Sequence, residues 1–258
     1  MMRLFTMIVA MIVVAAIGFA QSSPPPADAQ KVEADKLYNE GNALFRSGNY
    51  SGAIEKYKAA LAIAKDYKYY YQIGISYKNS RQMVQAVASL EESVKAKNDF
   101  AAGYHALGGT YQTGGQYDKS IEAFKLAVKY NPSYEPSKKG IEEAYAGKIQ
   151  ELSDAGKYED AGTFSDEALA TYKDNPKLYL LASRAYNRLD QMQKAIEAAQ
   201  QALKLKKRGG MGAEHYEIGV AYKKMKDWQK AREAFNEAKK DPQYSRHAQY
   251  ELDGMKGR

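Results

Sequence analysis

Apolar and small residues recur along this chain at helical spacing, and the whole pattern returns about every 34 residues. Side chains three or four positions apart share one helix face, so a run of this kind predicts an amphipathic helix. Each repeat of the pattern contains two such runs with a short polar turn between them. The pattern therefore predicts an all-α chain of six helix pairs, carried by segments 37–61, 70–94, 104–128, 145–169, 179–203 and 215–239.

Small residues hold fixed places in this pattern, which predicts where helices touch. Two helices approach closely only where the side chains between them are short. One small residue stands near the start of each second helix, and another follows seven positions later: Ala53, Ala86, Ser120, Ala161, Ala195 and Ala231, then Ala60, Ser93, Ala127, Ala168, Ala202 and Ala238. Gly41, Gly74, Gly108 and Gly219 have the same role on first helices. Ser183 substitutes in the fifth unit, and Ile149 breaks the rule in the fourth.

This arrangement of small and large residues resembles the tetratricopeptide repeat (TPR), whose period is 34 residues. The resemblance implies a right-handed superhelical solenoid, in which each unit contacts only its neighbours. One elongated domain is expected over residues 31–258, with a capping helix over about 243–254 after six units: 34–66, 67–100, 101–134, 135–175, 176–211 and 212–242.

The fourth unit differs from the others in length. The steps between the second-helix small residues are 33, 34, 41, 34 and 36 positions. We expect its first helix to begin early, near 134–137, and so to absorb the seven extra residues. A solenoid tolerates such an insertion because its contacts are between neighbours.

The amino terminus has the pattern of a secretory signal peptide. A short basic start is followed by the apolar stretch Leu4–Ala20, and Gly18-Phe19-Ala20 predicts cleavage before Gln21. A second site of this kind lies at Ala27-Asp28-Ala29. We therefore assign 1–20 as signal peptide and 21–30 as a flexible Pro/Ser spacer. The alternative is an uncleaved membrane anchor, although 17 apolar residues are few for a spanning helix.

The cysteine count narrows the expected location and chemistry. The chain has no cysteine, which excludes a disulfide, a thiol nucleophile and the lipidated amino terminus of bacterial lipoproteins. The leader is bacterial in style, so we expect an exported protein of the periplasm or cell envelope. A secreted eukaryotic origin is the other interpretation of the same leader.

The basic excess of the chain is confined to its carboxy-terminal end. The formal net charge is +7, yet residues 21–200 carry 23 basic and 23 acidic side chains. Residues 201–258 carry 14 basic and 8 acidic ones. This end could attract an anionic segment of a partner. The alternative is a solvated lysine-rich surface, and no nucleic-acid motif is present.

The resemblance further implies that first helices line a concave groove and grip a partner segment there. The amino-terminal part of this predicted groove is aromatic and mixed, with Tyr38, Asn42, Phe45, Tyr71, Lys78 and His105. The carboxy-terminal part is basic, with Arg184, Asn187, Arg188, Lys223 and Lys224. Further groove candidates are Gln112, Glu143, Gln150, Ser153, Asp154, Lys177, Tyr216 and Val220.

The spacing of the two arginines predicts a clamp for a carboxylate. Arg184 and Arg188 are four residues apart and share a helix face, with Lys223 and Lys224 expected opposite. The alternative is that these cations are solvated or pair with acidic neighbours such as Glu217 and Glu143. One TPR subclass holds the carboxylate tails of heat-shock chaperones, and Asn42 matches one of its clamp positions. Gln72, Ala102 and Ala106 depart from that pattern, so this subclass is not expected.

The sequence offers no case for an enzyme, a metal site or a cofactor. The three histidines, His105, His215 and His247, lie in different units, and neither HExxH nor GxSxG occurs. The expected function is a non-enzymatic protein-interaction scaffold of the bacterial cell envelope. Two alternatives stay open: a peptidoglycan- or carbohydrate-associated module, favoured by the 22 tyrosines, and a structural subunit of an export or outer-membrane assembly.

Overall fold

The computed structural model describes residues 27–257, and the predicted signal peptide lies outside them. All regular secondary structure in this part of the chain is α-helical. The helices are α1 (Ala27–Arg46), α2 (Tyr50–Ile63), α3 (Tyr67–Asn79), α4 (Met83–Ala96), α5 (Ala101–Thr113), α6 (Tyr117–Tyr130), α7 (Glu135–Asp154), α8 (Tyr158–Thr171), α9 (Pro176–Arg188), α10 (Met192–Leu205), α11 (Gly212–Lys224), α12 (Trp228–Lys239) and α13 (Ser245–Asp253). None of these helices combines the length and the apolar character needed to cross a bilayer.

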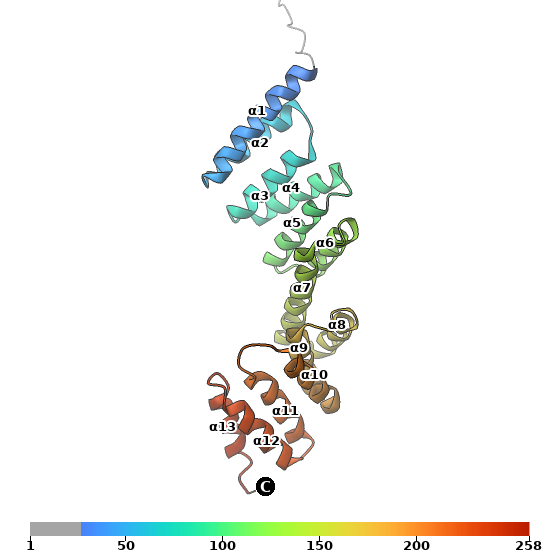
Figure 1. Cartoon of the computed structure of the whole chain (residues 1–258), viewed down its shortest axis with the longest axis vertical. Helices are drawn as coiled ribbons and strands as arrows, with labels where there is room; N and C mark the ends of the chain where they lie inside the picture. Colours follow the sequence, from blue (N-terminus) through green and yellow to red (C-terminus); the bar gives the residue numbers. More distant parts are fainter. Residues whose placement is uncertain (1–26, 258) are drawn as a thin grey trace, which may run out of the picture.

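Helices that follow one another in the chain pack together, and the pairs stack into an elongated solenoid (Figure 1). The predicted all-α solenoid is confirmed. The short helix α13 packs against α12 at the carboxy-terminal end of the stack. At the other end α1 begins at Ala27, so the last four residues of the stretch expected to be a spacer are helical, and the second candidate cleavage site lies in the first turn of this helix.

Small residues sit where helices meet, as predicted. All twelve small residues of the second helices have 0% exposed surface. On the first helices, a Cβ atom added at Gly41 would lie 2.6 Å from the ring of Tyr57, and one at Gly219 would lie 2.7 Å from the ring of Phe235. Gly74 faces Leu90 and Gly108 faces Phe124 in the same way. A larger first-helix residue would therefore collide with the second helix of its own pair.

The two units without glycine at this position solve the contact in different ways. In the fourth unit Ile149 takes the place of glycine, and Ser165 takes the place of the large second-helix residue, so the sizes are exchanged and the combined volume is roughly kept. In the fifth unit both residues, Ser183 and Ala199, are small. All four side chains are fully buried.

Each turn within a pair is closed by one residue with a left-handed backbone. These residues have φ between 56° and 80°, and they are Gly48, Arg81, Gly115, Gly156, Asp190 and Lys226. The N–H of the following residue donates to a carbonyl five positions back, for example Asn49 to Leu44 at 2.9 Å and Asp227 to Tyr222 at 3.0 Å. This is the Schellman ending of a helix, which favours glycine because other residues are strained there.

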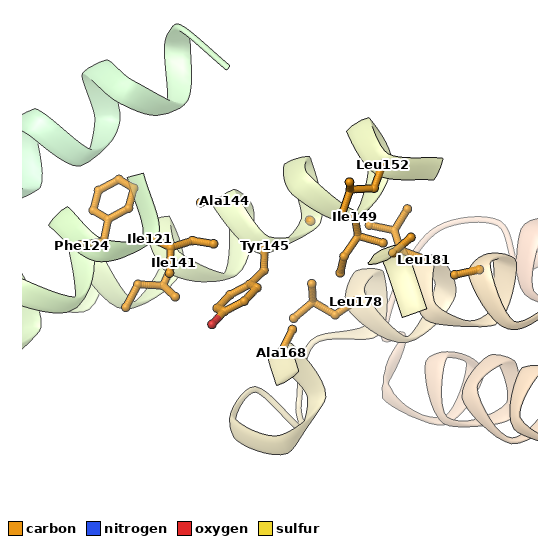
Figure 2. Close-up of a cluster of buried hydrophobic side chains, with 13 residues drawn as sticks. Ile121, Phe124, Ile141, Ala144, Tyr145, Ile149, Leu152, Ala168, Leu178 and Leu181 are labelled. Atoms are coloured by element: carbon orange, nitrogen blue, oxygen red, sulfur yellow. The ribbon is translucent and has the colours of Figure 1, made fainter. Parts of the chain in front are cut away.

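The fourth unit accommodates its extra residues by lengthening α7 at its amino terminus. The helix begins at Glu135, inside the predicted range, and runs for 20 residues, whereas α5 and α9 have 13. Figure 2 shows its buried face, with Ile141 near α6 and Ile149 nearer to the side chains of α9. One cluster of buried side chains thus joins the third, fourth and fifth units across this long helix.

The buried small residues predict a stability effect. Replacing Ala127 with leucine adds volume where α6 meets its neighbours, so we expect the free energy of unfolding to fall by roughly 1–3 kcal/mol. Thermal or urea denaturation measures the change. The matched control is Ala43→Leu, because Ala43 is exposed on helix α1. Equal stability of the Ala127 variant and the wild type would contradict the assigned packing.

The left-handed turns predict a stabilising substitution. Lys226 is exposed with φ of 61°, and glycine in its place removes the clash of its Cβ. Since this relief exceeds the entropy that glycine adds to the unfolded chain, Lys226→Gly should raise the free energy of unfolding by roughly 0.5–1 kcal/mol. Gly48→Ala should lower it, and urea denaturation reports both. A loss of stability in Lys226→Gly would show that the turn does not need this conformation.

Candidate functional site

The first helices lie on the inner side of the curved stack. Consecutive first helices contact each other along the series α3, α5, α7, α9 and α11, whereas the second helices mostly contact first helices. In a curved solenoid the inner layer is the more closely spaced one, so this series lines the concave face.

A hollow of about 720 Å³ lies at the carboxy-terminal end of this face. It is formed by the end of α7, the start of α8, and by α9, α11 and α13. We call it the C-terminal cavity. The structure brings together many residues that the sequence predicted as groove candidates: Gln150, Ser153, Asp154, Arg184, Asn187, Arg188, Tyr216, Val220 and Lys224.

Part of the cavity wall was not found from the sequence. Tyr158 comes from the first turn of α8, and Tyr244, His247 and Glu251 come from the segment of α13, which we expected only to cap the solenoid. The spacing of these last three residues, three and four positions, places them on one helix face and was the available signal. The spacing does not show which residues of other helices these three side chains contact.

The four predicted clamp cations are mostly neutralised, and here the structure differs from the expectation. Arg184 Nε lies 3.4 Å from Glu217 Oε1, and its Nη2 donates to the Tyr244 hydroxyl at 2.9 Å. Lys223 pairs with Glu251 beside the cavity. Lys224 pairs with Asp190 at 2.7 Å and donates to the Asn187 carbonyl.

Of these four cations, Arg188 is the least engaged, although its charge also acts to lower the pKa of the Glu217 carboxyl. It is exposed and, among the described residues, forms no ion pair; its guanidinium lies over the Tyr158 ring at 5.8 Å. Arg184 contacts Glu217 through Nε and Tyr244 through Nη2, so it is engaged with the protein itself. Of the alternative interpretation, pairing with acidic neighbours holds for Arg184, Lys223 and Lys224, and the exposed Arg188 agrees with a solvated side chain.

The floor of the cavity is a buried polar pair. Asn187 is 3% exposed, and its Nδ2 donates to the Glu217 carbonyl at 3.0 Å and to Glu217 Oε2 at 2.9 Å. Burial raises the pKa of the Glu217 carboxyl, although the Asn187 amide and the charge of Arg184 act in the opposite direction. Burial also raises the pKa of the neighbouring Tyr216 to about 12, helped by the charge of Glu251.

A second hollow of about 710 Å³ continues the groove toward the middle of the solenoid. It is lined by predicted candidates of three units, among them Gln112, Glu143 and Lys177. Gln150 and Asp154 line both hollows. The two therefore form one continuous polar groove from α5 to α13.

The predicted aromatic residues of the first unit face their own neighbours. The Tyr38 ring packs 5.6 Å from Tyr57 and 5.3 Å from Tyr69, measured between centroids. Asn42 Oδ1 accepts a hydrogen bond of 2.8 Å from the Tyr57 hydroxyl, and Phe45 packs on Tyr50. All three predicted residues are half-buried. Their main contacts hold the first helix pair together.

The remaining candidates are Tyr71 and Lys78 of the second unit and His105 of the third, and the Lys78 charge acts on the His105 imidazole. Tyr71 packs on Phe100 at 5.2 Å, and His105 Nδ1 lies 3.0 Å from the Ser137 hydroxyl. Burial lowers the pKa of Lys78. Burial also lowers the pKa of His105, with a further effect from the Lys78 charge, so this imidazole is neutral at neutral pH. All three side chains are half-buried.

Within residues 27–257, no three His, Asp or Glu side chains gather closely enough to hold a metal ion. The polar groups of the groove are instead arranged in pairs between helices. Such an arrangement can hold a polar or charged ligand along its length.

The raised pKa of Glu217 predicts a pH dependence of stability. The folded protein binds this proton more readily than the unfolded chain, so the stability that the group contributes is present below about pH 4.5 and falls as pH rises through the folded pKa. Glu217→Gln lacks this contribution. The free energy of unfolding of wild type minus variant should therefore be larger at about pH 4.5 than at pH 7 in urea titrations. A difference that grows toward pH 7 would contradict the assignment.

Known proteins similar to this chain share its repeats over limited lengths. Small glutamine-rich tetratricopeptide repeat-containing protein 2 of Mycosarcoma maydis is 27% identical over 117 residues, which are 45% of this chain and 33% of that protein. Heat shock protein STI1 of Saccharomyces cerevisiae is 25% identical over 114 residues, 43% of this chain and 19% of that protein. The chain thus spans a third or less of the length of both curated relatives.

Solved structures show the same fold. The crystal structure of YrrB, a TPR protein with an unusual peptide-binding site, matches with a TM-score of 0.53 at 15% identity. The match covers 75% of this chain and 97% of YrrB. At this identity the likeness concerns the fold alone.

Family models described as tetratricopeptide repeat match five separate segments. These are residues 34–67, residues 67–100, 101–134 and 176–208, and residues 215–243. Together they cover more than half of the chain, and they coincide with the helix pairs of the first, second, third, fifth and sixth units. The chain belongs to the tetratricopeptide repeat family.

Proposed function

We propose that this protein is a non-enzymatic scaffold that binds a segment of a partner protein in its concave groove and works in the bacterial cell envelope. The observation that carries the proposal is the continuous polar groove from α5 to α13, lined by side chains of seven helices. Surfaces of this kind bind by polar contacts spread over a long segment. TPR proteins are in general non-catalytic scaffolds, which agrees with this assignment.

The chemistry of the groove favours an extended, polar partner segment. Its walls combine tyrosines with amide and charged side chains, and tyrosine offers a large rigid face with one polar tip. The excess of basic residues after residue 200 favours a segment that carries acidic groups. Such a segment could lie along the groove and cross several units.

The similarity to STI1 does not by itself transfer a chaperone partner to this chain. The clamp residues that hold a chaperone tail are mostly replaced here: Ala106 is 5% exposed and apolar, and the Asn42 side chain accepts from Tyr57. Gln72 Nε2 lies 3.5 Å from the Tyr38 hydroxyl. We therefore propose a partner of the envelope rather than a chaperone tail.

A photocrosslinking amino acid in place of Gln150 tests the groove directly. Gln150 is exposed and lines both hollows, so it should cross-link to a partner in cells. The control position is Gln193, which is exposed on the second helix α10. Mass spectrometry identifies the products. Cross-links of equal yield at both positions, or none at position 150, would contradict binding in the groove.

The proposed export makes a separate prediction. Removal of the leader should give a mature protein that begins at Gln21, or at Gln30 if the second site is used. Amino-terminal sequencing and intact mass of protein purified from the producing cells distinguish these products. A protein that keeps Met1 and stays in the cytoplasmic fraction would refute export.

A further inference from the structure

The basic excess of the carboxy-terminal end is concentrated in two short segments outside the groove. Residues 203–212 carry four basic and no acidic side chains, and residues 238–247 carry three basic and one acidic. Together they supply the whole excess of six basic residues that 201–258 has. The first segment holds the loop between α10 and α11, which Figure 1 shows arching away from α10, and the second joins α12 to α13. None of these basic residues lines either hollow of the groove.

A close contact between glycines and Asp241 brings the two segments together. A Cβ atom added at Gly210 would lie 2.0 Å from Asp241 Oδ2, and one at Gly212 would lie 2.4 Å from Asp241 Cβ. The Gly212 N–H donates to Asp241 Oδ2 at 3.0 Å. The basic side chains on either side of this contact therefore belong to one surface, at the end of the solenoid.

Lys206 holds the loop in its shape, and its charge is used inside the protein. Its ammonium group donates to Glu214 Oε1 at 2.7 Å and to the Gly210 carbonyl at 2.5 Å. Glu214 is 2% exposed. A buried carboxylate that loses its cation is strongly unfavourable, so this pair resists opening of the loop. The other cations of the loop are thus presented in a fixed arrangement.

These other cations of the two segments are exposed, and only Lys240 has an ion-pair partner, Glu237 at 2.6 Å. Lys256 pairs with Asp253 and lowers its pKa most, and Lys239 adds a smaller effect. Within residues 27–257, no ion pair or side-chain hydrogen bond is formed by Lys204, Lys207, Arg208, Lys239 or Arg246. We call these five cations, together with Met211 of the loop, the basic end surface.

Met211 favours a membrane over a soluble polyanion as the partner of this surface. It is 42% exposed in the same loop as Lys207 and Arg208, and an exposed methionine side chain gains only where an apolar phase is within reach. The interface of a bilayer offers phosphate groups and acyl chains together. Lysine and arginine side chains reach such phosphates while their apolar stems stay in the layer below. No acceptor of the protein fixes these cations, so they can follow headgroups that move.

We propose that the basic end surface attaches the protein to a bilayer of anionic phospholipids, with lipid phosphates at its cations and Met211 among the upper acyl chains. Each cation near such a membrane strengthens binding roughly fivefold. The surface shares no residue with either hollow, so an attached molecule keeps its groove available. The inference goes beyond the proposed function and does not depend on it.

Vesicles of defined composition test the proposal. The full chain is titrated with vesicles of phosphatidylcholine alone, or of phosphatidylcholine and phosphatidylglycerol in equal amounts, and sedimentation measures the bound fraction. The neutral vesicles report any binding through a retained leader. We expect much tighter binding to the anionic vesicles and a steep loss at high salt, because salt screens the attraction. Equal binding to both kinds of vesicle would overturn the proposal.

Lys207→Gln combined with Arg208→Gln removes two of the five cations. Affinity for the anionic vesicles should fall about 10- to 50-fold. The matched control is Lys65→Gln with Lys173→Gln, which removes the same charge from exposed positions in the connections α2–α3 and α8–α9. The control should bind within about twofold of the wild type, because the attraction acts only within a Debye length of the membrane. Equal weakening by both double variants would show attraction by overall charge and refute a local surface.

Met211→Ser separates lipid from a soluble polyanion. Loss of apolar burial should weaken vesicle binding about three- to tenfold. Binding of soluble polyphosphate should not change. If Met211→Ser binds vesicles as the wild type does, or if soluble polyphosphate displaces the protein completely at the same phosphate concentration, the surface binds polyanions and the lipid proposal fails. Thermal melting followed by circular dichroism checks that each variant folds, and no change is expected because all three loop side chains are exposed.

The outcomes separate this inference from the proposed function. Failure of vesicle binding refutes membrane attachment alone, because cross-linking at position 150 reports on the groove. Absence of that cross-link refutes the proposed function and leaves the vesicle result standing.

Discussion

The close approach of the two helices in a pair depends on one contact, between facing residues of which at least one is small. Gly41 lies against Tyr57 and Gly219 against Phe235, with no room for another carbon atom. Where isoleucine replaces glycine, at position 149, the facing residue shrinks to Ser165. The volumes of the two facing residues thus limit how closely the helices of a pair approach. Close pairs stack on one another, and the concave face is a consequence of that stacking.

The fourth unit shows how much irregularity the stack accepts. Its first helix is two turns longer than α5 or α9, and the family models match the chain up to residue 134 and again from residue 176. The additional turns carry Ile141, which extends the buried cluster toward α6. Seven added residues are close to two helical turns, so the faces of the helix keep their direction. The insertion therefore lengthens the interface, and the same face of α7 stays buried along its whole length.

The net charge of the groove depends on ion pairs between side chains of different units. The basic excess lies after residue 200, yet Lys223 and Lys224 meet Glu251 and Asp190 from other helices. Arg184 reaches the hydroxyl of Tyr244, 60 positions away in the chain. Paired side chains hold α9, α11 and α13 in place and leave little net charge for a ligand. Among the described residues of the cavity, the Arg188 guanidinium forms no ion pair, and the buried Asn187 side-chain oxygen has no hydrogen-bond partner.

The sequence alone determined the helix pairs, their small contact residues and the early start of α7, because these follow from periodicity and side-chain size within about 40 neighbouring residues. It did not determine which cations are neutralised. Lys224 and Asp190 are 34 positions apart and Asn187 and Glu217 are 30 apart, so only the stacked helices show that they meet. The same holds for Tyr244, His247 and Glu251, whose helix looked like a simple cap. Ion pairs and buried hydrogen bonds require atoms within about 4 Å, and the tertiary structure alone sets those distances.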